Sequence, residues 1–143
     1  MGFLTGKTAI ITGGGRAVLS NGECGSIGYG IATAYAKEGA NLVLTGRNVQ
    51  KLTDAKEELE KKYGIKVLPV QADVSAGSDN EAIVQNVVKQ AIDTFGRIDV
   101  LINNAQASAS GVTIADHTTE QFDLAVYSGL YAAFYLSLIH ISE

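Results

Sequence analysis

Two glycine-rich stretches stand between a short apolar run and the helical pattern that follows it. Residues 12–15 are Thr-Gly-Gly-Gly, and residues 25–30 are Gly-Ser-Ile-Gly-Tyr-Gly. Glycine permits sharp turns and lets bare backbone amides approach a ligand, and a helix N-terminus favours negative charge. Between a buried strand and a helix, this pattern predicts the phosphate site of a dinucleotide-binding fold. Taken alone, the glycines would also suit a flexible surface loop.

A second candidate is Arg47, which follows the next apolar run in the sequence Thr-Gly-Arg. A dinucleotide fold contacts the adenosine ribose at this point. An acidic residue there accepts from a ribose 2′-hydroxyl, whereas an arginine suits a 2′-phosphate. The alternative is an ordinary solvated arginine.

Two further polar positions come directly after later apolar runs. Asp73, followed by Val74, is placed to accept a hydrogen bond from an adenine amino group, although an aspartate here is also a common turn residue. Asn103 and Asn104 precede the small Ala105, which would let a cofactor lie close. Paired asparagines after a strand are also consistent with a simple turn.

The elements that must position these residues alternate along the chain. Apolar, β-branched runs predict strands over residues 8–12, 41–44, 67–70 and 100–102. Amphipathic patterns predict helices over residues 27–38, 49–63 and 80–95, and Thr-Thr-Glu-Gln at 118–121 is a capping box that opens a last helix. Alternating strands and helices predict right-handed βαβ units in a parallel sheet covered on both faces. We therefore expect an α/β fold, a Rossmann-type doubly wound sheet of order 3-2-1-4, with Pro69 on an edge strand and the ligand between strands 1 and 4.

Composition narrows the class of protein. The chain has 143 residues, which suits one domain, and its formal net charge of −4 argues against a nucleic-acid partner. No apolar run is long enough to span a bilayer, and the N-terminus shows no secretion signal. The single cysteine, Cys24, cannot form an internal disulfide. We therefore expect a cytoplasmic protein with no membrane and no nucleic-acid partner.

Taken in order, these motifs resemble those of the short-chain dehydrogenase/reductase family, from about residue 7 to residue 134. The resemblance implies an NAD(P)-binding Rossmann domain over residues 1–135. It assigns the pyrophosphate of the cofactor to Gly13, Gly15, Ile27 and Gly28, with Gly14 and Ser26 in the same turn. It assigns the adenine to Asp73 and Val74. The ribose and nicotinamide are assigned to Asn104 and Ala105. It also implies that Asn103 ties neighbouring strands together. Arg47 makes NADP the expected cofactor and NAD the less favoured one.

The family's reaction is hydride transfer between the nicotinamide and a carbonyl or alcohol carbon of a small-molecule substrate, as in a 3-oxoacyl reductase. It needs a tyrosine with a lysine four residues later, and none of the six tyrosines has one. The chain therefore resembles the N-terminal part of such an enzyme, inactive alone, whose full-length form is a homo-oligomer.

Several residues depart from the family pattern. Ser26 stands in place of a turn glycine, as in the enoyl-reductase branch, and Gln106 replaces the glycine after Asn-Asn-Ala. Gly129 occupies the position of a helix asparagine that serves a proton relay. These changes keep open an alternative function, a non-catalytic NADP-binding sensor or scaffold.

The last eight residues, 136–143, are Leu-Ser-Leu-Ile-His-Ile-Ser-Glu. One reading frame of a transposon-type sequencing adapter encodes this string. We therefore expect residues 136–143 to be a non-native tail, encoded where the reading frame passes from the gene into adapter near Tyr135. The later strands of the fold would then be missing from this chain. The alternative is a genuine apolar helix end.

Overall fold

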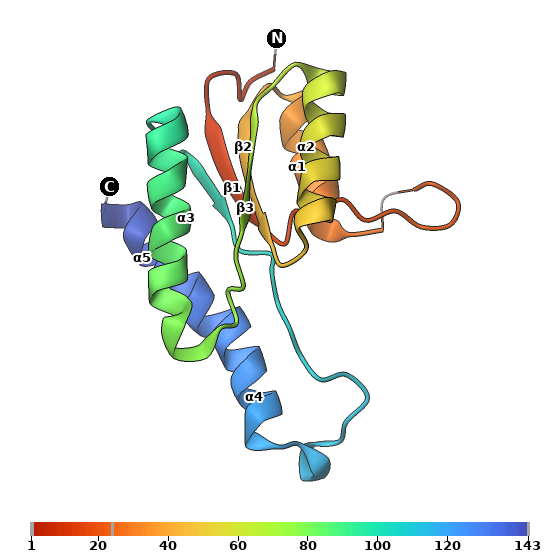
Figure 1. The fold of residues 1–143 in the computed structure, drawn as a ribbon, viewed down its shortest axis with the longest axis vertical. Helices are drawn as coiled ribbons and strands as arrows, with labels where there is room; N and C mark the ends of the chain where they lie inside the picture. Colours follow the sequence, from red (N-terminus) through yellow and green to blue (C-terminus); the bar gives the residue numbers. More distant parts are fainter. Residues whose placement is uncertain (1, 24, 143) are drawn as a thin grey trace.

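A four-stranded parallel sheet of order β3-β2-β1-β4 forms the centre of the molecule, in the order that the sequence predicts (Figure 1). This computed structural model describes residues 2–23 and 25–142, with side chains as far as residue 138. Cys24 and most of the proposed tail side chains therefore lie outside the described residues. The strands are β1 (Thr8–Thr12), β2 (Asn41–Gly46), β3 (Val67–Gln71) and β4 (Val100–Ile102). The helices are α1 (Ile27–Lys37), α2 (Val49–Tyr63), α3 (Asn80–Phe95), α4 (Thr119–Val126), a π-helical turn (Tyr127–Tyr131) and α5 (Ala132–Ser142).

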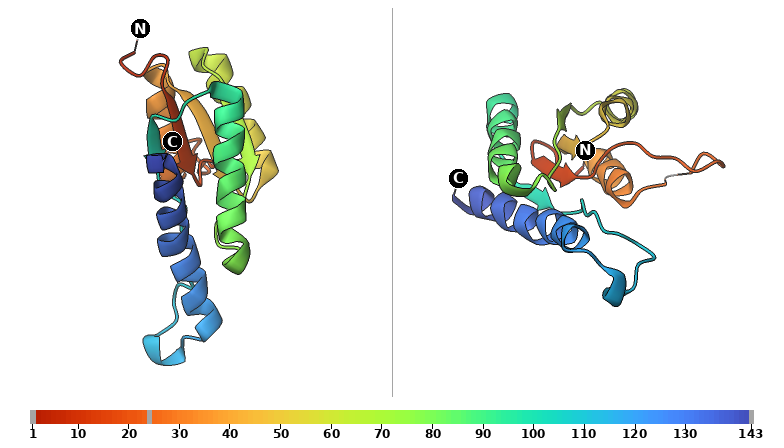
Figure 2. Two further views of the ribbon diagram at one scale, coloured as in Figure 1. Left: turned by 90° about the vertical axis from the view of Figure 1, so that its left-hand side faces the viewer. Right: turned by 60° about the horizontal axis from the view of Figure 1, so that its bottom comes forward.

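Helices cover both faces of the sheet because successive strand residues point to opposite sides. Ala9 and Ile11 of β1 pack with α1 and α2, whereas Ile10 between them packs with α3. Figure 2 shows α3 and α5 side by side on one side of the sheet and α1 and α2 on the other. All five residues of β1 are buried, as expected for a central strand of a parallel sheet.

Element boundaries follow local chemistry. Helices α2 and α3 end at Gly64 and Gly96, whose φ angles of 68° and 73° lie in the left-handed region that favours glycine. The capping box at the start of α4 is confirmed: Thr118 Oγ1 accepts from the Gln121 amide, and the Gln121 side chain accepts from the Thr118 amide. Strand β2 runs two residues beyond the predicted end at residue 44, and β3 runs one beyond residue 70. Pro69 lies in the edge strand β3, as predicted.

The C-terminal helical segment packs on α3. Leu136 is 2% exposed and lies with Val84 and Val88 of α3 in a small apolar cluster. The first residue of the predicted tail is thus part of a buried interface. The sequence predicts only where this segment begins; the π-helical turn that divides it into α4 and α5 is a feature of the structure alone.

The long connection from β1 to α1 extends away from the body of the molecule (Figures 1 and 2). Its outer part is hairpin-like, with backbone bonds of 2.8 Å from Leu19 N to Glu23 O and from Gly25 N to Ala17 O. Its base is held to α2, because the Arg16 amide donates to Lys51 O at 2.8 Å and the Arg16 guanidinium pairs with Glu58. The glycine-rich connection is therefore anchored at its base.

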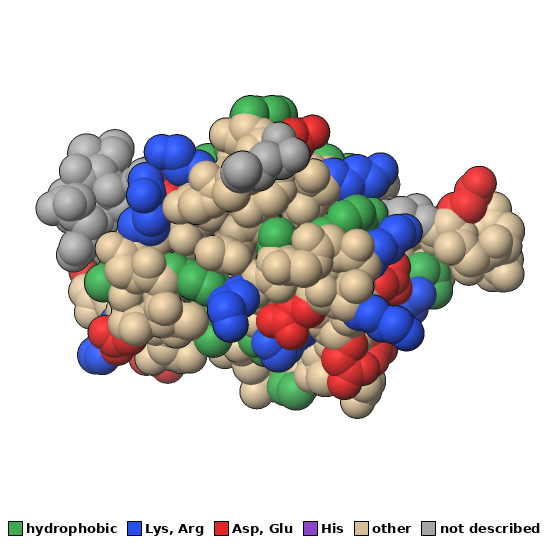
Figure 3. Space-filling model, turned by 90° about the horizontal axis from the view of Figure 1, so that it is seen from above, with side chains coloured by type: hydrophobic (Ala, Val, Ile, Leu, Met, Phe, Trp, Pro, Cys, Tyr) green, Lys and Arg blue, Asp and Glu red, His purple; other side chains and the backbone are tan. Residues whose placement is uncertain are grey.

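The surface carries charges of both signs. Figure 3 shows basic and acidic side chains interspersed on the face seen from above, rather than gathered by sign. Among the residues that the structure describes, no helix is both long and apolar enough to cross a membrane.

Candidate functional site

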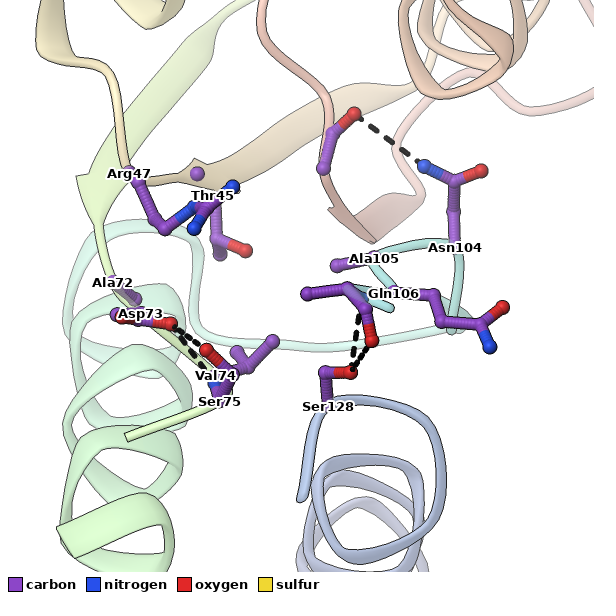
Figure 4. Close-up of a pocket in the computed structure, with 13 residues that line it drawn as sticks. Thr45, Arg47, Ala72, Asp73, Val74, Ser75, Asn104, Ala105, Gln106 and Ser128 are labelled. Atoms are coloured by element: carbon purple, nitrogen blue, oxygen red, sulfur yellow. Dashed lines mark hydrogen bonds between the residues drawn. The ribbon is translucent and has the colours of Figure 1, made fainter. Parts of the chain in front are cut away.

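A pocket of about 260 Å³ opens where the carboxyl ends of all four strands meet. In a doubly wound sheet this edge is where ligands bind, because the connections from neighbouring strands diverge there. Figure 4 shows Arg47 and Asp73 on one side of the pocket and Asn104, Ala105 and Gln106 on the other. The lining residues are Gly13, Thr45, Gly46, Arg47, Ala72, Asp73, Val74, Ser75, Asn104, Ala105, Gln106, Ala107 and Ser128.

Thr12 joins the end of β1 to the segment that follows β4. Its side-chain oxygen accepts from the backbone amides of Asn104, at 3.0 Å, and Ala105, at 2.9 Å. The Asn104 side chain also bonds to the end of β1, since its Nδ2 donates to Thr12 O at 2.9 Å and to Gly13 O at 3.4 Å. These bonds hold Ala105 against the glycine turn.

The prediction that Asn103 ties neighbouring strands together is wrong. The Asn103 amide instead donates to Ser137 Oγ of α5 at 3.4 Å, and Asn104 makes the side-chain bonds to the β1 end. Consecutive residues leaving a strand point in opposite directions, so only one of the two can face β1. Asn104, rather than Asn103, therefore joins the segment after β4 to the end of β1.

The glycine turn has a shape that requires glycine at two positions. Gly13 has a φ of 69° and lines the pocket. A Cβ on Gly28 would lie 2.1 Å from Gly13 O, so a side chain there would collide with backbone. The first turn of α1 thus packs directly on the end of β1.

The other predicted turn residues lie outside the pocket lining. Gly14 donates its amide to Thr45 O at 3.1 Å, and a Cβ on Gly15 would lie 3.0 Å from the Lys51 side chain. Ser26 Oγ donates to Gly15 O at 3.4 Å, and Ile27 is 76% exposed. The structure therefore brings Gly13, Arg47, Asp73, Val74, Asn104 and Ala105 to the pocket, and leaves Gly14, Gly15, Ser26, Ile27 and Gly28 around the adjoining turn.

Asp73 and Arg47 give the β2–β3 side of the pocket its charge. Asp73 Oδ1 accepts from the Ser75 amide at 2.9 Å and from Ser75 Oγ at 2.5 Å. Those bonds, chiefly the one from the Ser75 hydroxyl, hold the pKa of Asp73 below its usual value, and Arg47 adds to the effect. Arg47 forms no ion pair with any described residue, so its guanidinium is available to an anion.

Several lining residues are not predicted from the sequence as part of the site. Gln106 and Ala107 directly follow the Asn-Asn-Ala motif, so extending that motif by two residues would have included them. Ser128 comes from the π-helical turn, and no local signal marks it. It reaches the pocket only because the last helical segment folds back beneath the β4 connection (Figure 4).

Tyr29 and His117 are poorly suited to donate a proton to a carbonyl substrate, and neither lines the pocket. Tyr29, in the glycine turn, is 4% exposed, and burial raises its pKa to about 12, which makes it a weaker acid than free tyrosine. His117 is exposed, and its Nδ1 lies 3.1 Å from Thr113 O, as suits a surface histidine. Within residues 2–23 and 25–142, no three His, Cys, Asp or Glu side chains gather in a way that could hold a metal ion.

Comparison with known proteins agrees with this geometry. The family model for short chain dehydrogenases matches residues 7–141. The chain belongs to this family. A 12alpha-hydroxysteroid dehydrogenase from a Clostridium species is 64% identical over 135 residues, which cover 94% of this chain and 49% of that protein. The chain spans about half the length of the curated relatives it matches.

Solved structures of the family share the arrangement of elements. The L-sorbose reductase of Gluconobacter frateurii, complexed with NADPH and L-sorbose, superposes with a TM-score of 0.82 at 32% identity, over 97% of this chain and 48% of that one. The NADPH-dependent 3-quinuclidinone reductase of Rhodotorula rubra gives a TM-score of 0.77 at 27% identity, over 94% and 46%. The chain therefore has the fold of short chain dehydrogenases, a fold shared by reductases that use NADPH.

Proposed function

We propose that this chain is the cofactor-binding half of an NADP-dependent oxidoreductase that acts on a hydroxysteroid. The reaction is hydride transfer between the nicotinamide and a carbonyl or alcohol carbon. Because no tyrosine of the chain has a lysine four residues later, the chain alone binds the cofactor without turning over substrate.

The cofactor assignment rests on the position of Arg47. It lines the pocket at the end of β2 beside Asp73, and it has no ion pair among the described residues. In a dinucleotide fold the ribose 2′ position lies at the end of this strand. A guanidinium binds a phosphate by charge-assisted hydrogen bonds, whereas a carboxylate at the same position would repel the 2′-phosphate of NADP. The family neighbours solved with NADPH support the same preference.

The remaining parts of the cofactor follow from the order of the strands. We assign the adenine to Asp73 and Val74, the ribose and nicotinamide to Asn104 and Ala105, and the pyrophosphate to the turn that contains Gly13, Gly14, Gly15, Ser26, Ile27 and Gly28. Bound there, the nicotinamide supplies the hydride chemistry. Asp73 Oδ2 supports the adenine assignment, since no described residue donates to it.

Titration of the chain with NADPH and NADH tests the Arg47 assignment. Loss of a charge-assisted bond is worth about 1.5–3 kcal/mol, so Arg47→Ala should weaken NADPH binding by roughly 10–150-fold and leave NADH binding within about twofold. Lys89→Ala is the matched control, because it removes one exposed positive charge on α3 outside the pocket. Equal losses for the two nucleotides, or none for NADPH, would refute the assignment.

The substrate class rests on the 64% identical 12alpha-hydroxysteroid dehydrogenase. Its test is the oxidation of a 12α-hydroxysteroid with NADP by the protein encoded by the complete gene, followed as NADPH absorbance. A complete protein that reduces 3-oxoacyl thioesters or enoyl thioesters instead, or that only binds NADP, would overturn it.

We expect the complete protein to be a cytoplasmic homo-oligomer, which sedimentation and cell fractionation would test. We also propose that residues 1–135 are the native domain and residues 136–143 an adapter-derived tail. Codons that differ from the adapter sequence would rule out the tail.

A further inference from the structure

The π-helical turn Tyr127–Tyr131 contacts both sides of the pocket through two buried polar side chains. Turns of this kind are rare, occur mostly as single turns inside α-helices, and are frequently found at functional sites. Here the turn lies between α4 and α5, close to the β4 connection that lines one side of the pocket (Figure 4). Asn80 connects the turn to one side of the pocket, and Ser128 connects it to the other.

The first connection runs through Asn80 to the adenine side. Asn80 is 1% exposed at the start of α3, and its Nδ2 donates to Val74 O and, at 3.1 Å, to Tyr127 O. Val74 is 7% exposed and lines the pocket. One buried amide thus ties the wall after β3 to the first residue of the π-helical turn.

The second connection runs through Ser128 to the wall after β4. Ser128 is 3% exposed, and its Oγ accepts from the Ala107 amide at 2.9 Å. The hydroxyl has one proton of its own, which can go to Leu124 O at 2.7 Å or to Ala107 O at 3.0 Å. The segment Gln106–Ala107 is therefore held to the π-helical turn by a side chain that also lines the pocket.

These two bonds connect the π-helical turn to two walls of the pocket: the segment after β3 that contains Val74, and the segment after β4 that contains Ala107. Asn80 bridges 47 residues to Tyr127, and Ser128 bridges 21 residues to Ala107. Neither wall has regular secondary structure at the bonded position. Each wall gains its position relative to the other through the turn.

We propose that Asn80 and Ser128 are positioning residues that set the spacing of the two cofactor walls through the π-helical turn. This inference rests on the proposed NADP site. Ser128 acts on the nicotinamide side only, because its partner Ala107 follows Ala105 and Gln106. Asn80 acts on the adenine side, because its partner Val74 follows Asp73.

Two nucleotide probes separate these roles in the 143-residue chain. On the proposed assignment NADPH spans both sides of the pocket, whereas adenosine 2′,5′-bisphosphate, which lacks the nicotinamide and its ribose, reaches Arg47, Asp73 and Val74 and the glycine turn but not the segment after β4. Loss of one neutral hydrogen bond is worth about 0.5–1.5 kcal/mol, so Ser128→Ala should weaken NADPH binding about 3–10-fold and leave the bisphosphate within about twofold. Asn80→Ala should weaken both probes.

Thr53→Val is the matched control, since it removes a helical hydroxyl that bonds four residues back, to Val49 O at 3.0 Å, on α2. It should leave both affinities unchanged. If Ser128→Ala weakens both probes equally, in proportion to a fall in melting temperature, or weakens neither, the positioning role is overturned. A wild-type chain that binds the bisphosphate and not NADPH also overturns it. A wild-type chain that binds neither probe overturns the proposed function and this inference with it.

Discussion

Replacing Gly28 with alanine tests the packing that brings α1 onto the end of β1. The added Cβ would lie 2.1 Å from Gly13 O and 2.6 Å from Asn104 Nδ2. Ordinary contacts between heavy atoms are about 3.5 Å or more, so the first turn of α1 must move away from Gly13 O by about 1.4 Å. Neither obstacle is a flexible chain end: one is backbone, and the other is held by its bond to Thr12 O.

The magnitude follows from the nature of those obstacles. Overpacking a well-filled interior costs typically about 1–3 kcal/mol, and a fixed backbone carbonyl puts this site at the upper end. A loss of about 3 kcal/mol lowers the melting temperature of a chain of this size by roughly 10 °C. The same movement opens the turn around Gly13, so NADPH binding should weaken at least about tenfold.

Gly129→Ala is the matched control. Its Cβ would lie 3.8 Å from the Gln106 side chain, and the backbone there is helical. Alanine is favoured over glycine in a helix by up to about 1 kcal/mol, so this variant should be as stable as the wild type or more so. Urea unfolding and NADPH titration of both variants decide the matter. A Gly28→Ala protein that melts within about 2 °C of the wild type and binds NADPH normally would show that α1 does not pack on Gly13 as described.

Two further predictions concern stability. Arg97, then the Thr8 amide and Lys7, hold the pKa of Asp99 down to about 2. The ionised carboxylate therefore stabilises the fold at any pH above its unfolded pKa of about 3.9. That stabilisation is lost as the pH falls toward about 2. Because the partners are partly solvated, we expect Asp99→Asn to cost only about 1 kcal/mol at pH 7, and the gap from wild type in urea unfolding to close between about pH 4 and pH 2; a gap that does not depend on pH would contradict this. Leu136→Ala should cost about 2–5 kcal/mol, because Leu136 is 2% exposed against α3, while Leu138→Ala, at a 52% exposed position, should cost little. Equal midpoints for these two leucine variants would mean that the α3–α5 contact does not form in solution.

Much of the fold is determined locally and could be predicted from the chain. Helix α2 begins at Val49 and ends at Tyr63 as predicted, because its apolar spacing, Leu52, Ala55 and Leu59, and the terminal Gly64 lie within the element itself. Once strands and helices alternate, handedness and burial leave few sheet orders, so the position of the pocket at the strand ends also follows. Arg47, Asp73 and Ala105 were found because each lies within three residues of the end of a predictable strand.

The roles of Asn103 and Asn104 needed the tertiary structure. Their chemistry is identical, and only the direction in which the chain leaves β4 decides which one faces Thr12 across 92 residues of sequence. Ser128 and Asn80 are similar cases, since their partners lie 21 and 47 residues away and no local pattern records such distances. Helical periodicity, which depends on neighbours three or four residues apart, likewise carries no signal for the π-helical turn. The sequence by itself determined the elements and the strand-end residues of the site, while the tertiary structure alone decided which side chains join the walls of the pocket.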